Sequence, residues 1–288
     1  LKEKAYPEAG KAICRKIALE GNIQGNKPEE KIYRLEAAIA SVPAELNPIL
    51  TAVLARWYWH YFQQNNWRFL NRSATAQLDD KDFTTWDLPK LFKKIGGLYL
   101  QVLKNRDILV KQSIRDWKDF LELGNQPLEY RPTLYDFTLY QALEFFTSGE
   151  QAGAHPEDTF EIPAESPVLD DSKAFLSWKP KTTDTDSPKY QAVVLYQALL
   201  AFHASDKDPG AFLDADLWRL RWARTAAIGE IAAERYIKQL GSFAEKNADH
   251  PVSCTALANI AQELINQGKP AEAHKIASEG AKKHTSSD

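Results

Sequence analysis

The stretch that decides the fold is residues 57–67, which read Trp57-Tyr58-Trp59-His60-Tyr61-Phe62-Gln63-Gln64-Asn65-Asn66-Trp67. It places six aromatic rings within about three turns of a helix. Each ring carries a large apolar area, and such areas dominate the energetics of cores and interfaces. The segment is therefore either the centre of a helical core or the lining of a binding groove.

Helical phasing favours the core. Trp57 shares a helix face with Tyr61, and Tyr58 shares the adjacent face with Phe62, because each pair is four residues apart. The two faces continue an apolar stripe that begins at Leu46. A wide apolar stripe of this kind is typical of a buried helix.

Trp59 and His60 point away from that stripe, toward a second helical layer or a partner. Together with Arg72 they form the candidate interaction surface. The alternative is a groove in a helical carbohydrate-active enzyme, in which His60, Tyr58 and Arg72 would be the acid-base groups.

Helix-period patterns with capping residues at their ends fill most of the chain. Asp87 is the expected N-cap of a helix that ends near Leu103. Ser113 is expected to cap a helix over 114–123, and Thr133 one over 134–146. From residue 187 to 284 the helical pattern resumes, with breaks near 206–210, 229, 247–251 and 268–270. The predicted fold class is all-α.

Residues 149–188 differ from the rest because prolines interrupt them throughout. They are the candidate crossover or linker. The predicted organisation is an N-terminal helical subdomain over 1–148 with an aromatic core, the proline-rich segment over 149–188, and a C-terminal helical subdomain over 189–288.

The C-terminal stretch carries one periodic signal, a partial match to the tetratricopeptide repeat. Large, small and turn residues fall at the offsets of that repeat at Leu257, Ile260, Ala261, Leu264, Gly268, Ala273, Ala277 and Gly280. Ala277 departs from the pattern, which usually has an aromatic residue there. The expected architecture is a tetratricopeptide-like α-α superhelix of stacked antiparallel hairpins, a type of surface that usually binds other polypeptides.

Composition and motifs exclude several classes of function. The net charge is −3 and the pI about 6.1, so there is no basic excess to neutralise the phosphates of a nucleic acid. No run of 18 apolar residues predicts a membrane span. Common phosphate-binding, zinc-protease and serine-hydrolase motifs are missing from the sequence, and we predict no catalytic residue, cofactor or metal site.

Two further features of composition are informative. Cys14 and Cys254 lie near opposite ends of the chain, outside any CxxC pair, and are expected to act as small hydrophobic residues. Acidic pairs such as 170/171, 206/208 and 214/216 adjoin turns or helix starts, where capping and solvation explain them. The sequence contains no methionine, and we expect it to be a piece of a longer chain.

Three segments are informative together. They are residues 57–62 with Trp67 and Arg68, residues 82–88 (Asp-Phe-Thr-Thr-Trp-Asp-Leu), and residues 130–137 (Tyr-Arg-Pro-Thr-Leu-Tyr-Asp-Phe). In that order they resemble the N-terminal helical region of very large bacterial proteins of the alpha-2-macroglobulin family. The resemblance implies a secreted protein of the periplasm or cell envelope, in which this region precedes a series of β-sandwich domains. Such proteins are thought to trap proteases through a bait region, often with a thioester formed by a Cys-x-Glu-Gln motif.

Neither cysteine of this chain lies in that motif, so the trapping chemistry is not expected here. The function implied is that of a non-enzymatic helical scaffold whose partner is a protein or the rest of its own longer chain. Two alternatives stay open, a free-standing tetratricopeptide-like adaptor and the helical carbohydrate-active enzyme described above.

Overall fold

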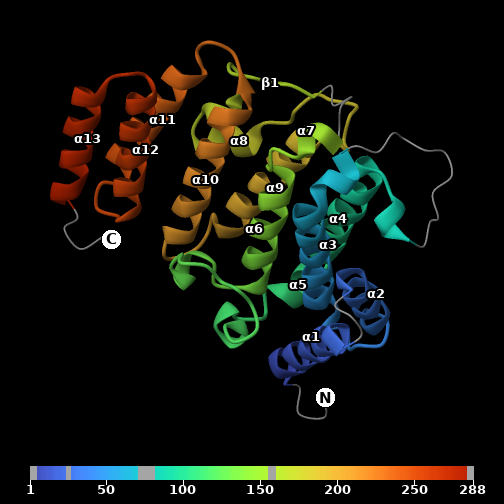
Figure 1. The fold of residues 1–288 in the computed structure, drawn as a ribbon. Coiled ribbons are helices and arrows are strands. Elements are labelled where there is room, and N and C mark those ends of the chain that lie inside the picture. Colours follow the sequence, from blue (N-terminus) through green and yellow to red (C-terminus); the bar gives the residue numbers. More distant parts are fainter. Residues whose placement is uncertain (1–4, 24–26, 71–81, 155–159, 284–288) are drawn as a thin grey trace. The chain divides into compact units, whose positions relative to one another are not determined.

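Helices run along most of the chain in the computed structural model shown in Figure 1. The structure describes residues 5–23, 27–70, 82–154 and 160–283. These residues form thirteen α-helices and two strands of two residues each. The prediction of an all-α fold is therefore confirmed. The chain divides into two compact units, Leu1–Glu157 and Asp158–Asp288, which are described separately.

The N-terminal unit is built on α3, against which α2, α4 and α6 pack. Its α-helices are α1 (Tyr6–Ile23), α2 (Pro28–Ile39), α3 (Asn47–Leu70), α4 (Leu88–Leu103), α5 (Arg106–Leu109), α6 (Leu134–Phe146) and α7 (Gln151–Ala154). Short 3-10 helices lie at η1 (Phe83–Thr85), η2 (Ile114–Trp117) and η3 (Leu128–Tyr130).

Aromatic rings fill the space between these helices. Trp59 of α3 stacks on Phe62 at a centroid distance of 5.4 Å and meets the edges of Phe92 and Phe145 at 5.4 and 5.2 Å. Tyr58 lies 4.9 Å from the ring of Phe83 in η1. Each such pair adds about 0.5–1.5 kcal/mol beyond the burial of its area. The aromatic block is therefore the centre of the core of this unit.

At two of the three predicted helix starts, both the cap and the helix that follows it agree with the sequence. The Asp87 carboxylate accepts a hydrogen bond from the Lys90 backbone N–H at the start of α4. Thr133 and Asp136 form a reciprocal capping box at the start of α6.

The helix predicted over 114–123 is wrong. Ser113 does accept a hydrogen bond from the Arg115 backbone N–H, but only the 3-10 turn η2 follows. The Ile114 backbone N–H donates to the Pro132 carbonyl at 2.9 Å, and Ser113 pairs with Thr133 in an antiparallel bridge. The backbone of residues 113–114 thus pairs with residues 132–133, and a regular α-helix does not form after Ser113.

The C-terminal unit begins with an extended segment and continues as a row of helices. Its elements are β1 (Ile162–Pro163), η4 (Pro167–Leu169), α8 (Ser172–Ser177), α9 (Pro188–His203), α10 (Gly210–Ala226), β2 (Ala227–Ile228), α11 (Ala232–Lys246), α12 (Val252–Asn266) and α13 (Pro270–Lys283). From α9 to α13 each helix packs on the next, and α10 also contacts α12. The breaks between these helices coincide with those predicted from the sequence.

Residues 160–178 pack within this unit. Strand β1 pairs with β2 in parallel, with Ile162 opposite Ala227 and Pro163 opposite Ile228. The η4 turn contacts α8, α10 and α11, and α8 contacts α9. Part of the segment that the sequence marks as a crossover is thus integral to the C-terminal unit.

The last two helices form an antiparallel hairpin around small residues. Gly268 has a φ of 73°, a left-handed conformation that glycine adopts without strain, and it turns the chain between α12 and α13. Ala261 and Ala273 are buried. A Cβ on Gly280 would lie 3.4 Å from the Leu257 side chain, so the two helices approach closely there.

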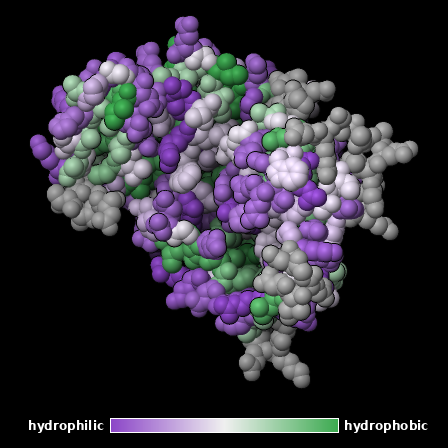
Figure 2. Space-filling view, in the orientation of Figure 1, coloured by the Kyte–Doolittle hydropathy of each residue, from purple (hydrophilic) through white to green (hydrophobic). Residues whose placement is uncertain are grey.

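The face of the molecule seen in Figure 2 is covered mainly by hydrophilic side chains, and hydrophobic ones gather there in several separate groups. Among the described residues, none of the helices has the length and apolar character needed to cross a membrane. Cys14 is buried and Cys254 is partly buried, and both are free thiols.

Candidate functional site

The structure corrects the position of Trp59, which was predicted to belong to an interaction surface. Its side chain is only 2% exposed and lies among rings from α4 and α6. Trp57, which was predicted to be core, is only partly buried. The physical reason is that α2, α4 and α6 all pack on α3. The buried face of α3 is therefore wider than the single apolar stripe read from the sequence, and it includes Trp59 but not all of Trp57.

The predictions for Tyr58, Tyr61 and Phe62 are confirmed, since all three side chains are buried. Burial and the nearby Glu36 carboxylate raise the pKa of Tyr58 above its usual range. Its hydroxyl therefore faces a carboxylate at the edge of the core, and its ring does not line a groove.

His60 lies on the exposed side of α3, as predicted. Partial desolvation of its ring and then the positive charge of Arg56 lower the pKa of His60, and Glu122 and Glu144 oppose that shift. Arg56 itself donates to the Glu144 carboxylate at 2.8 Å. Arg72, the third predicted residue, lies outside the described residues.

Asn65 ends the regular part of the aromatic helix. Its backbone angles, φ −129° and ψ 23°, interrupt α3, and its amide donates to the Tyr61 carbonyl at 2.9 Å. Beyond this kink Trp67 is 65% exposed. The exposed ring of the block is thus at its end rather than at position 59.

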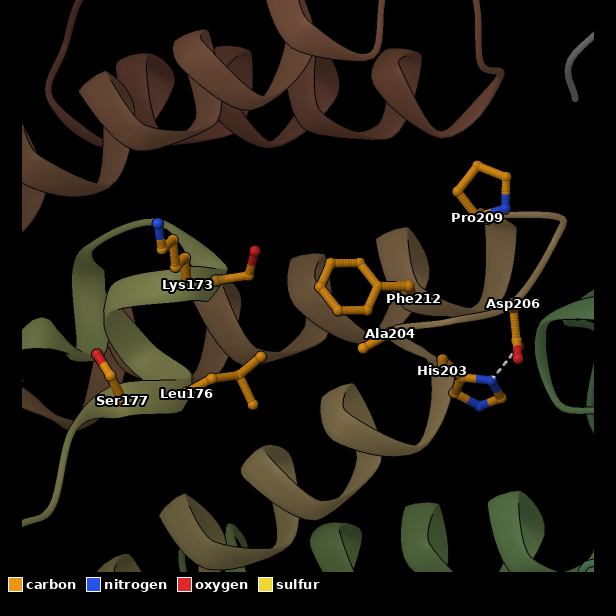
Figure 3. A pocket seen from close by; sticks show the side chains of 9 residues that line it. Lys173, Leu176, Ser177, His203, Ala204, Asp206, Pro209 and Phe212 are labelled. Atoms are coloured by element: carbon orange, nitrogen blue, oxygen red, sulfur yellow. Dashed lines mark hydrogen bonds and ion pairs between the residues drawn. The ribbon is translucent and has the colours of Figure 1, made fainter.

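A pocket in the C-terminal unit, formed entirely by described residues, is a candidate binding site. We call it the α8 pocket, and it has a volume of about 530 Å³. Its lining comes from α8, from the end of α9 with the following turn, and from the start of α10. The lining residues are Ser172, Lys173, Leu176, Ser177, His203, Ala204, Asp206, Pro209 and Phe212. Figure 3 shows their arrangement.

The two sides of the α8 pocket differ in chemistry. Lys173 and Ser177 stand on the α8 side, and His203 and Asp206 lie at the opposite side (Figure 3). Leu176, Ala204 and Phe212 lie between them and make the centre apolar.

His203 fixes the carboxylate at one end of the pocket. Its ring is buried at the end of α9, and its Nδ1 lies 2.7 Å from Asp206 Oδ2. The Asp206 side chain remains 41% exposed. The pair therefore holds the Asp206 carboxylate in place while leaving part of it in contact with solvent.

Arg219 determines where α8 lies. This arginine is completely buried on α10 and donates to the Asp216 carboxylate at 2.8 Å and to the carbonyls of Val168 at 2.5 Å and Asp170 at 3.0 Å. Its guanidinium also lies 4.7 Å from the ring centroid of Phe175 in α8. Burial raises the pKa of Asp216, and the Arg219 guanidinium opposes that rise.

Two further side chains fix the same segment. Arg235 of α11 donates to the carbonyls of Ala164 and Ser166 and pairs with the Asp170 carboxylate. Gln197 of α9 donates to the carbonyls of Phe175 at 2.8 Å and Trp178 at 2.7 Å, which satisfies the end of α8. The α8 side of the pocket is therefore held by helices α9, α10 and α11.

The acidic pairs have mixed roles. Asp171 caps α8 and Asp208 accepts a hydrogen bond from the Gly210 backbone N–H, as predicted. Asp170, Asp206 and Asp216 instead pair with Arg235, His203 and Arg219, so the capping explanation is wrong for them. The Asp170 pair was missed because Arg235 lies 65 residues away in sequence, whereas Arg219 follows Asp216 by three residues and their spacing on one helix face could have indicated the pair. Within the described ranges, no three His, Cys, Asp or Glu side chains form a group that could hold a metal ion.

No family model, curated protein or solved structure matches this chain.

Proposed function

We propose that this chain is a non-enzymatic helical scaffold that binds polypeptides, and that it is the N-terminal helical region of a large secreted protein of the alpha-2-macroglobulin type. The observation that carries the scaffold part is the row of helices from α9 to α13, in which each helix packs on its successor. Stacked helical hairpins present extended surfaces that are well suited to polypeptide partners.

The α12–α13 hairpin supports a tetratricopeptide-like superhelix within this proposal. Small residues at Ala261 and Ala273 are buried at the contact, and Gly280 lies against Leu257. Gly268 makes the turn with a positive φ. These are the mechanical roles that the repeat pattern requires of small and turn residues.

The family part of the proposal rests on the three segments that carry the resemblance. Tyr58 of the first segment contacts Phe83 of the second, and the helices that contain or follow the segments, α3, α4 and α6, pack on one another. The segments are thus parts of one core, as expected if they are structural features of a shared domain. The proposed location is the periplasm or cell envelope, and the proposed partner is a protein or the rest of the same longer chain.

Burial of the aromatic block weighs against the carbohydrate-active alternative. That function required the rings near Tyr58 and His60 to line a groove, whereas Tyr58, Trp59 and Tyr61 are 1%, 2% and 3% exposed. The rings stabilise the N-terminal unit instead.

Site-specific photo-crosslinking of the natural full-length protein in the cells that encode it tests the scaffold. A photoreactive residue at the exposed Ile265 or Ile228 should give a discrete product with one identified protein or with another part of the same chain. The matched control is Ile260, which is buried and should give none. Equal products from Ile260 and the exposed sites, or none from either exposed site, would contradict the scaffold.

Cell fractionation tests the family part independently. The proposal expects the tagged protein in the envelope or secreted fraction, with a mass far above 32.6 kDa. Recovery of a small protein in the cytoplasmic fraction would instead support the free-standing adaptor.

A further inference from the structure

The α8 pocket has opposite charges at its two ends and an apolar centre. Lys173 stands at the rim on the α8 side, and Asp206 lies at the opposite side beside His203 (Figure 3). Between them, Leu176 and Phe212 are half-buried and leave part of their apolar area in contact with solvent. The pocket thus combines three recognition elements within one volume.

The volume fits part of a peptide. About 530 Å³ lies within the range of roughly 300–1,000 Å³ that is usual for ligand pockets. A bulky aliphatic or aromatic side chain with its flanking backbone would cover the apolar centre and remove Leu176 and Phe212 from water. Burial of apolar area is the main source of affinity in such contacts.

The charges define what should flank that side chain. Lys173 is exposed and forms no ion pair with any residue that the structure describes. Its ammonium group is on a flexible four-carbon chain and therefore adapts to a carboxylate near the rim. Asp206 is held by His203 in a fixed position and is suited to a cationic group at the other end.

We propose that the α8 pocket binds a segment of a partner polypeptide that carries one bulky apolar residue between an acidic and a basic residue. The acidic residue pairs with Lys173, the apolar side chain packs on Leu176 and Phe212, and the basic residue pairs with Asp206. The proposal rests on the proposed function, because it takes the chain to be a polypeptide-binding scaffold.

Titration of the whole 288-residue chain with short peptides, followed by two-dimensional amide NMR, tests the proposal. The probe is the acetylated and amidated peptide Gly-Glu-Leu-Lys-Gly. We expect shifts confined to residues of α8, the α9–α10 turn and the start of α10. Replacing the leucine of the peptide by alanine should weaken binding by about tenfold, because most of the buried apolar area is lost.

Charge variants of the protein test the two ends separately. Lys173→Glu should weaken binding of the probe about two- to fivefold, as expected for an exposed ion pair, and should favour a Gly-Lys-Leu-Lys-Gly peptide. The matched control is Lys181→Glu, an exposed lysine outside the pocket with the same charge change. Asp206→Asn, which keeps a hydrogen-bonding group near His203, should weaken binding of the probe and leave a Gly-Glu-Leu-Glu-Gly peptide unaffected or tighter.

Three outcomes would overturn the proposal. They are shifts that do not localise to the pocket, equal binding of the leucine and alanine peptides, and equal effects of the variants at 173 and 181. The peptides could fail to bind while photo-crosslinking at Ile265 or Ile228 still yields a defined partner. That result would contradict peptide binding at the α8 pocket and leave the proposed scaffold function supported.

Discussion

Arg219 shows how a single buried charge organises the C-terminal unit. Its guanidinium has exchanged water for the Asp216 carboxylate, two backbone carbonyls and the face of Phe175. A buried pair of this kind adds little net stability compared with an apolar pair, but removal of one partner leaves an uncompensated charge. The position of α8 therefore depends on both members.

Replacement of Arg219 tests this dependence. Arg219→Met should lower the free energy of unfolding by about 3–5 kcal/mol, because the Asp216 carboxylate stays buried without its partner. Arg219→Met combined with Asp216→Leu should recover part of that loss, since neither charge is then buried. The control is Arg221→Met, which removes an exposed arginine of the same helix and should cost about 1 kcal/mol or less. Urea denaturation measures all three, and equal losses for Arg219→Met and Arg221→Met would contradict the role of the pair.

The single residue Tyr236 should make the stability of the protein depend on pH. Burial raises the pKa of Tyr236 to about 12 from the ordinary value of 10.0. Between these values the unfolded chain loses the phenol proton first. The stability that the buried, protonated Tyr236 contributes is therefore complete below pH 10 and is lost as the pH rises toward 12. The urea midpoint should therefore fall less between pH 9 and pH 11 in Tyr236→Phe than in the unmodified chain. An identical fall in both would show that Tyr236 titrates normally.

Helix ends are the elements that local sequence describes best. Asp87 and Thr133 cap α4 and α6 as predicted, because a cap depends on hydrogen bonds within one turn of the chain. Ser113 also caps as predicted, yet the helix after it ends at Trp117. The bridge to Thr133 decided that outcome, and a window of sequence contains no information about so distant a partner.

Glycines in the C-terminal helices provide a test at the scale of elements. Gly268→Ala should destabilise the unit by about 1–2 kcal/mol, because alanine is strained at a φ of 73°. Gly241→Ala should stabilise it by roughly 0.5–1 kcal/mol, since this glycine lies inside α11 and a Cβ there meets nothing within 4 Å. Thermal unfolding of the two variants checks the opposite signs. Stabilisation by both substitutions would show that the turn between α12 and α13 is not tight.

At the scale of the whole molecule, the division into units depends on residues 160–178. The sequence suggests a linker there because of its prolines, whereas the structure ties this segment to α9, α10 and α11 through Gln197, Arg219 and Arg235. Proline excludes a long helix but does not exclude a packed segment of turns. The partners that anchor the segment lie up to 71 residues away in sequence.

Truncation tests this assignment. A fragment of residues 158–288 should unfold cooperatively in urea and keep its helical circular dichroism. A fragment of residues 189–288, which matches the boundary suggested by the sequence, should unfold at a lower urea concentration. Its Arg219 and Arg235 would lose the carbonyls that they bind in the longer fragment. Equal midpoints for the two fragments would show that residues 158–188 are dispensable for this unit.

The sequence by itself determined the helical class, most helix boundaries after residue 187 and the burial of Tyr58, Tyr61 and Phe62, because periodicity and caps act over a few residues. Only the tertiary structure decided that Trp59 is core and Trp57 is not, because that depends on which helices cover α3. It also brought Lys173, Asp206 and Phe212 to one pocket. Sequence patterns reveal the preferences of a single helix, whereas a pocket arises from the packing of several helices.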